Sequence, residues 1–233
     1  MKQVRLEIGG TPALLWGERA EGIFLYIHGQ GGKKEEAADF AALACARGWQ
    51  VLSVDLPEHG ERAGRGPAME PWNVVPELEA VLAYAEGGWK RTALFAVSIG
   101  AWFSMLAFPP ERLERCLLVS PVLDMTRLIR RMMGWADVTE ERLRREKTIP
   151  TDFGQTLSIK YYEYTLTHMI TNWSVPTEVL YGAGDHLVER ETAEDFARRF
   201  RCGLTVMENG EHWFHTKEQM EFLDNWLKQE RRG

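Results

Sequence analysis

Residues 93–108 read ALFAVSIGAWFSMLAF, an apolar segment that is interrupted in its middle by a serine and a glycine. The pattern predicts a buried strand that turns at Ser98 into a helix. Ala96 and Gly100, two residues to either side of the serine, are small enough to let such a turn pack tightly. The hydroxyl of Ser98 would then project above the edge of a sheet, in front of the helix N-terminus. Ser98 is therefore a candidate nucleophile; the simpler interpretation is a serine that caps a helix.

Short apolar segments alternate with amphipathic segments along most of the chain. The predicted strands cover residues 4–8, 13–16, 23–27, 51–56, 93–97, 116–119, 178–181 and 204–207, and the predicted helices cover residues 35–47, 71–86, 101–108, 191–200 and 218–228. This alternation predicts an α/β fold with a mostly parallel central sheet of about eight strands and helices on both faces. The first two strands, separated by Gly9, Gly10 and Pro12, are expected to form an antiparallel hairpin at one edge.

Residues 125–173 interrupt the alternation. They show helical periodicity and no convincing strand. We therefore expect residues 1–233 to form a single domain in which residues 125–173 are a helical insert, lying as a cap over the edge of the sheet where the parallel strands end.

Composition narrows the range of partners. The chain has 233 residues, with 28 basic and 34 acidic residues and a formal net charge of −6, which does not favour nucleic-acid binding. No apolar stretch has the length of a membrane span, and residues 1–10 lack the apolar core of a signal peptide. Cys45, Cys116 and Cys202 show neither a metal-binding spacing nor a disulfide pattern. We expect a cytoplasmic protein with reduced, buried thiols and no metal.

A glycine-rich segment, His28-Gly29-Gln30-Gly31-Gly32, follows the third predicted strand. Such a turn can present backbone N–H groups into a cleft. The amides of Gln30 and Ile99 are therefore candidate donors to an oxyanion. The alternative, a phosphate-binding turn, lacks the Lys-Ser/Thr pair of a P-loop, although Lys33 is close.

The fourth predicted strand leads into Asp55-Leu56-Pro57-Glu58-His59-Gly60. An aspartate at such a position tends to accept hydrogen bonds from nearby backbone amides, so we expect Asp55 to stabilise this loop. His59 is interpreted as a structural residue, because no acidic residue is evidently placed to orient it.

Two later loops add an acid and a base. Asp185 ends Gly182-Ala183-Gly184-Asp185 after one predicted strand, and His212 ends Gly210-Glu211-His212 after the last one. Loops at the carboxyl ends of parallel strands share one edge of the sheet, so both side chains are expected near Ser98. A serine hydroxyl needs a base such as His212, and Asp185 would orient that imidazole. His215 and Asp124 remain alternatives for the base and the acid.

Together these segments resemble the α/β-hydrolase superfamily, and within it the small esterases and acyl hydrolases with a helical lid. The match extends over nearly the whole chain, and the order Ser98, Asp185, His212 agrees with that of the family. Ala96 stands where the family usually has glycine. The resemblance implies hydrolysis of an ester, a thioester or occasionally an amide through an acyl-enzyme, without a cofactor.

The insert is rich in methionine and aromatic residues, namely Met125, Leu128, Ile129, Met132, Met133, Trp135, Tyr161, Tyr162, Tyr164, Met169 and Trp173. By resemblance they would line an acyl pocket under a lid, and we select Met133, Tyr161, Tyr162 and Trp213 as substrate-binding residues. Most residues of this kind could equally pack the insert against the body. The arginines of the insert could steer an anionic substrate or form a solvated face paired with glutamates.

The sequence thus predicts a serine hydrolase that cleaves a small or medium carboxylic ester or thioester, with carboxylesterase as the working description. A serine aminopeptidase and an acyl-thioesterase are alternatives on the same three residues. A non-catalytic ligand-binding protein of the same fold is a further alternative. The expected partner is a small-molecule acyl substrate, and the expected state is a monomer or homodimer.

Overall fold

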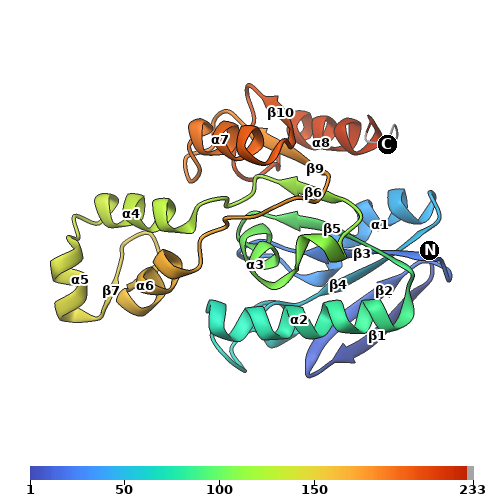
Figure 1. Cartoon of the computed structure of the whole chain (residues 1–233), viewed down its shortest axis with the longest axis horizontal. Helices are drawn as coiled ribbons and strands as arrows, with labels where there is room; N and C mark the ends of the chain where they lie inside the picture. The colour runs from blue at the N-terminus through green and yellow to red at the C-terminus, as the bar shows by residue number, and fades with distance from the viewer. Residues whose placement is uncertain (230–233) are drawn as a thin grey trace.

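The computed structural model describes residues 1–229, and its centre is an eight-stranded sheet in the order β1-β2-β4-β3-β5-β6-β9-β10 (Figure 1). The strands are β1 (Gln3–Ile8), β2 (Thr11–Trp16), β3 (Gly22–Ile27), β4 (Trp49–Val54), β5 (Arg91–Val97), β6 (Cys116–Val119), β9 (Thr177–Gly182) and β10 (Gly203–Met207). All neighbours from β4 to β10 pair in parallel, whereas β2 pairs antiparallel with β1 and β4. The predicted mostly parallel sheet and its edge hairpin are confirmed.

Helices cover both faces of the sheet. Strand β3 shows how alternate side chains of one strand enter the two cores beneath these helices. Ile23, Leu25 and Ile27 contribute to one buried cluster, while Phe24 and Tyr26 contribute to the other. Since successive side chains of a strand point to opposite faces, each buried strand serves two cores. The helices on the first face are α2 (Pro71–Gly88), α3 (Ile99–Ala107) and α7 (Arg190–Phe200); α1 (Ala38–Cys45) and α8 (Lys217–Gln229) lie on the second.

The chain leaves the sheet after β6 and returns to it at β9. Between them lie α4 (Met125–Trp135), α5 (Glu140–Glu146), β7 (Thr148–Pro150), β8 (Thr156–Ser158) and α6 (Ile159–Thr167). This inserted segment projects from one side of the sheet (Figure 1). The expectation that it contains no strand is wrong, because β7 and β8 pair as an antiparallel hairpin. Three-residue strands are too short to show a convincing alternation, although the pair Ile149 and Leu157 is buried and its neighbours are more exposed.

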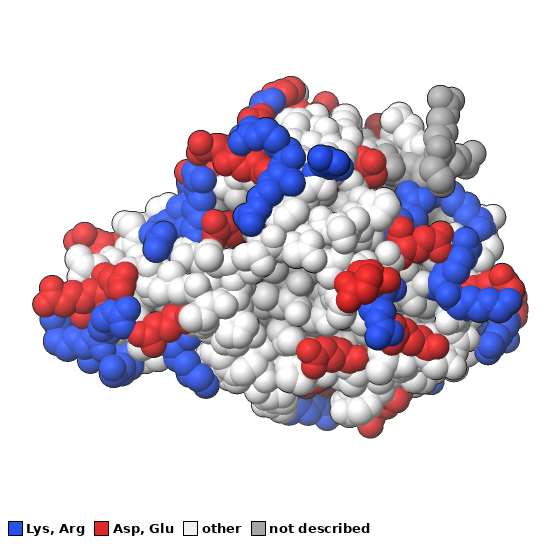
Figure 2. Space-filling model, viewed as in Figure 1, with Lys and Arg blue, Asp and Glu red and all other residues white. Residues whose placement is uncertain are grey.

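The three arginines of α5 are paired with carboxylates. Arg142 contacts Glu146, Arg144 contacts Glu140 and Glu163, and Arg145 contacts Glu146. Figure 2 shows the two signs of charge side by side at the end of the molecule that carries α5. These contacts support the interpretation of a solvated, paired helix face and give no reason to expect steering of an anion.

No helix within residues 1–229 is both long enough and apolar enough to cross a membrane. The three cysteines are free; Cys116 is buried, and Cys45 and Cys202 are half-buried.

Candidate active site

Ser98 lies at the tip of a sharp turn between β5 and α3. Its backbone has φ 51° and ψ −124°, a conformation that costs free energy for any residue other than glycine. The turn is held on both sides, because the Ser98 amide donates to the Val119 carbonyl and the Ser98 carbonyl accepts from the Val122 amide. The neighbouring strand β6 and its loop therefore support the strained serine.

Glycine allows close packing at two positions around this turn. A Cβ atom on Gly100 would lie 2.3 Å from the carbonyl oxygen of His28, and one on Gly29 would lie 3.0 Å from the Cβ of Ser98. The loop after β3 and the start of α3 therefore approach each other backbone to backbone. Ala96, where the family usually has glycine, is fully buried, so an alanine is accommodated there.

The imidazole of His212 lies against the hydroxyl of Ser98. The distance from Ser98 Oγ to His212 Nε2 is 2.7 Å, within range of proton transfer. The other ring nitrogen, Nδ1, lies 2.6 Å from Asp185 Oδ2. A carboxylate only accepts, so Nδ1 carries the proton and Nε2 is left free to accept one from the serine.

Asp185 is itself held in place by the backbone. Its side chain is fully buried, and Oδ1 accepts hydrogen bonds from the amides of Leu187 (2.8 Å) and Val188 (2.9 Å). The Tyr181 hydroxyl donates to the Val188 carbonyl and secures the same loop. One carboxylate oxygen therefore anchors the loop while the other faces the imidazole.

The loops that carry Asp185 and His212 follow β9 and β10, which are adjacent in the sheet. The Gly184 amide donates to the Gly210 carbonyl at 2.8 Å. A Cβ atom on Gly182 would lie 2.5 Å from the carbonyl carbon of Gly210. The glycines in both sequence motifs thus permit a backbone contact that brings two side chains 27 residues apart into hydrogen-bonding distance.

The alternative base and acid lie elsewhere. The Nδ1 of His215 faces the carbonyl of Trp213 and the carboxylate of Glu211, and its ring stacks on that of Trp213. Asp124 caps α4 by accepting from the amide of Arg127. Within residues 1–229 neither side chain is hydrogen-bonded to Ser98 or His212, so the geometry favours His212 and Asp185.

Gln30 and Ile99 lie beside Ser98 at the cleft described below. Ile99 is the first residue of α3, where backbone amides have no partner within the helix. Within residues 1–229 neither amide has a hydrogen-bond acceptor. Two unpaired N–H groups next to a serine hydroxyl can stabilise a developing oxyanion.

Two histidines hold the loop that carries Gln30. Gly31 donates its amide to Nε2 of His59, and Leu56 donates its amide to Nε2 of His28. Each histidine must therefore be neutral and protonated at Nδ1, which faces a backbone carbonyl. Burial lowers the pKa of His28 to about 4, consistent with this neutral form. His59 has the structural role expected for it.

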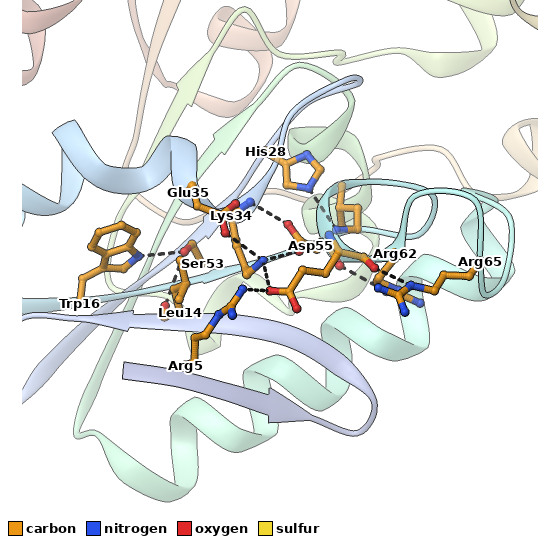
Figure 3. Close-up of polar contacts among 12 residues, drawn as sticks. Arg5, Leu14, Trp16, His28, Lys34, Glu35, Ser53, Asp55, Arg62 and Arg65 are labelled. Carbon is orange, nitrogen blue, oxygen red and sulfur yellow. Dashed lines mark hydrogen bonds and ion pairs between the residues drawn. The ribbon is translucent and has the colours of Figure 1, made fainter. Parts of the chain in front are cut away.

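A buried ion-pair network lies beneath the same loop (Figure 3). The ammonium of Lys34, only 1% exposed, lies 2.6 Å from a carboxylate oxygen of Asp55 and 2.6 Å from one of Glu61. Asp55 also accepts from the amides of Lys34 and Glu61, as its predicted role requires. Burial raises the pKa of Asp55, but these hydrogen bonds outweigh it, so the net pKa is lowered. The stabilisation is thus present above the unfolded-state pKa of about 4 and is lost as pH falls through the lowered pKa.

We expect the Lys34→Met variant to be destabilised by about 3–5 kcal/mol, because it leaves the carboxylate of Asp55 buried without its cation. Lys90→Met is the matched control, since Lys90 and its partner Glu21 are both largely exposed, and it should unfold like the parent protein. Urea denaturation followed by circular dichroism measures both. Equal midpoints for the two variants would show that the buried pair does not stabilise the fold.

The cleft beside Ser98 consists of two cavities that share Gln30, Ile99, Leu128, Met132 and Gln155. We call them the larger cavity, of about 640 Å³, and the smaller cavity, of about 130 Å³. Tyr161 lines the smaller cavity, as expected of a substrate-binding residue. The walls come mainly from α4 and from the β7–β8 hairpin.

Three of the predicted substrate-binding residues lie elsewhere. Met133 and Tyr162 are 7% and 1% exposed and belong to the hydrophobic core, and the Tyr162 hydroxyl also accepts from Arg130. Trp213 is 73% exposed and lies against His215. None of the three lines either cavity.

The larger cavity is lined instead by Met132, Trp135, Phe153 and Gln155, among others. Consecutive residues of a helix point about 100° apart, so Met132 faces the cleft where Met133 faces the core. Phe153 and Gln155 were not predicted, because they lie in the turn of the unexpected hairpin. The only sequence feature that could have indicated Phe153 as a cavity-lining residue is its aromatic side chain.

Within residues 1–229 no group of three or more histidine, cysteine, aspartate or glutamate side chains is arranged to hold a metal ion. The polar groups beside Ser98 described above are an imidazole, a carboxylate and backbone amides.

Comparison with known structures supports the fold described above. Est1E from Butyrivibrio proteoclasticus, with ferulic acid bound, superposes with a TM-score of 0.80 at 17% identity, over 97% of this chain and 96% of that one. Alpha/beta hydrolase domain-containing protein 10 from mouse gives 0.78 at 13% identity, covering 98% of each chain. The esterase PF2001 of Pyrococcus furiosus gives 0.68 at 16% identity, over 98% of this chain and 87% of the other. At these identities the likeness concerns the fold alone.

A search of curated protein sequences finds no significant match. The family model of the alpha/beta hydrolases, in contrast, matches residues 24–224, which run from within β3 to within α8 and therefore include all the loops that meet at Ser98. With this match and the eight-stranded sheet, the chain belongs to the alpha/beta hydrolase family.

Proposed function

We propose that this chain is a serine hydrolase that cleaves a small or medium carboxylic ester or thioester through an acyl-enzyme. The observation that carries the proposal is the hydrogen-bonded chain from Ser98 Oγ through the ring of His212 to Asp185. This is the arrangement that serine acyl transfer needs, since the hydroxyl must lose a proton as it attacks.

In the proposed reaction His212 Nε2 accepts the proton of Ser98 while Oγ attacks the carbonyl carbon. The negative charge that develops on the carbonyl oxygen is stabilised by the amides of Gln30 and Ile99. His212 then returns the proton to the leaving oxygen or sulfur, and the acyl group remains on Ser98. A water molecule, activated by the same imidazole, releases the acid and regenerates the hydroxyl.

We also propose that the inserted segment, residues 125–173, acts as a lid of a single domain. Met132 and Trp135 of α4 and Phe153 of the β7–β8 hairpin form one wall of the larger cavity. The body of the protein contributes Ser98 and Ile99 to the lining of the same cavity. A substrate at Ser98 would be enclosed between the two, and the exclusion of water strengthens the electrostatic contacts of the site.

A fluorophosphonate probe tests the proposal directly, because it phosphonylates only an activated serine. We expect labelling of the peptide that contains Ser98, detected by mass spectrometry. Folded protein that remains unlabelled would favour a non-catalytic ligand-binding protein. Labelling at another serine would identify that residue, and not Ser98, as the nucleophile.

The Asp185→Asn variant should lose about ten-thousandfold in kcat. An asparagine can present its amide to Nδ1 of His212 and so favour the tautomer that cannot accept the proton of Ser98. Asp124→Asn is the matched control, because Asp124 caps α4 and is not hydrogen-bonded to His212. Initial rates with p-nitrophenyl acetate measure both variants. A greater loss from Asp124→Asn would identify that residue as the acid.

A further inference from the structure

The cleft offers an ester two different environments, which adjoin at the residues proposed to hold the oxyanion. Gln30 and Ile99 line both the larger and the smaller cavity. A carbonyl oxygen held between their amides would therefore place one end of the ester in each cavity. The residues that line the two cavities decide which end of the ester each cavity binds.

The larger cavity lies on the side of the general base. Besides Ser98 it is lined by His186 and Leu187, which directly follow Asp185 and so belong to the loop that orients His212. The leaving oxygen has to receive its proton from His212 Nε2. The alcohol of the ester therefore extends into the larger cavity, and the acyl group extends away from it.

An aromatic pair forms part of the wall of the larger cavity. The rings of Trp135 and Phe153 meet edge to face, with centroids 5.8 Å apart and an interplanar angle of 86°, and the two residues are 45% and 40% exposed. Arg131 lies over the Trp135 ring at 5.4 Å and pairs with Glu189, so it holds the indole in place. Such a wall suits a flat apolar group.

The smaller cavity is lined mainly by the inserted segment and combines apolar with polar side chains. Its wall includes Met69, Met125, Ile129, Met132 and Leu157. Its volume of about 130 Å³ is similar to that of an apolar cavity of about 150 Å³ that binds benzene. Methionine side chains adapt to the shape of an alkyl chain. The cavity therefore accommodates an acyl chain of about six carbon atoms at most.

We propose that the cleft selects esters in one orientation: an aromatic alcohol against Trp135 and Phe153, and a short to medium alkyl acyl chain in the smaller cavity. This inference rests on the proposed function, because it uses the position of His212 to orient the ester. Benzyl butyrate is an ester of this class.

Two isomeric esters test the orientation. Benzyl butyrate and propyl phenylacetate have the same formula and the same benzyl and propyl groups, attached to opposite ends of the ester. Neither carbonyl is conjugated, so their intrinsic reactivities are similar. We expect kcat/KM to be about tenfold higher for benzyl butyrate. Equal values, or a preference for propyl phenylacetate, would overturn the inference.

Single substitutions test which residues cause the preference for an aromatic alcohol. Trp135→Ala and Phe153→Ala should each lower the ratio of kcat/KM for benzyl butyrate to that for methyl butyrate by about three- to tenfold. Tyr84→Ala removes an exposed aromatic residue of α2 that lines neither cavity and should leave the ratio unchanged. A ratio that is the same in all three variants would show that Trp135 and Phe153 do not bind the alcohol of the ester.

Ile129→Phe fills the smaller cavity and should shorten the preferred acyl chain in a series of p-nitrophenyl esters from acetate to decanoate. Met69→Phe repeats the test at a less buried position, in case the first variant does not fold. An unchanged chain-length profile in folded variants would contradict the assignment of this cavity. Fluorophosphonate labelling of Ser98 is measured in every sample, so that a wrong orientation is distinguished from a protein without an activated serine.

Discussion

The Ser98→Ala variant is expected to lose about a millionfold in kcat for p-nitrophenyl acetate, which leaves only the acceleration due to binding and the oxyanion donors. The variant removes the atom that forms the acyl-enzyme and the hydrogen bond of 2.7 Å to His212. It should also abolish labelling by the fluorophosphonate probe. Initial rates at high enzyme concentration, with burst kinetics of the parent protein, provide the measurement.

Ser104→Ala is the control for this variant. Ser104 lies in α3, is fully buried, and donates its hydroxyl hydrogen to the Gly100 carbonyl. Its loss should lower stability slightly and leave most of the activity. Because the alanine of the Ser98→Ala variant would occupy the turn at the same φ of 51°, the backbone strain is unchanged and the fold should persist. Substantial turnover by a folded Ser98→Ala protein would exclude the serine mechanism.

The His212→Ala variant should show a loss of similar size, about a millionfold, because the base and the nucleophile act as one unit. The double variant with Ser98→Ala should be no slower than either single variant. His215→Ala is the matched control, since this side chain faces Trp213 and Glu211 and is partly exposed. It should keep most of the activity.

The opposite pattern, with activity retained in His212→Ala and lost in His215→Ala, would reassign the base. Such a result would also require the loop after β10 to rearrange, because the contacts of His215 turn its ring toward Trp213 and Glu211. Chemical rescue of His212→Ala by added imidazole would instead support the assignment, since a free base could occupy the space left beside Ser98.

The fold could be predicted from local patterns because each of its parts has a local cause. The apolar strands over residues 23–27 and 93–97 are buried on both faces, so they appear as continuous apolar runs. The motifs at Ser98, Asp185 and His212 each follow a strand, and parallel strands bring such positions to one edge. Small residues beside each of them mark the close backbone contacts that Gly100 and Gly182 make.

The walls of the cleft could not be predicted in this way. Helical periodicity shows that α4 has an apolar side, but the rotation of α4 against the body decides whether Met132 or Met133 faces the substrate. The same holds for Tyr161 and Tyr162 in α6. The hairpin that carries Phe153 and Gln155 is held by only three residue pairs, too few for a periodic signal.

By itself, the sequence determined the class of fold, the positions along the chain of the strands that precede the functional loops, and the identity of Ser98, Asp185 and His212 as candidates. These properties depend on residue type and on spacing along the chain. Only the tertiary structure decided that Ser98, His212 and Asp185 are hydrogen-bonded, and which side chains of the inserted segment line the cleft. The physical reason is that contacts between distant segments depend on how helices and loops pack, and a shift of one position along a helix turns a side chain by about 100°.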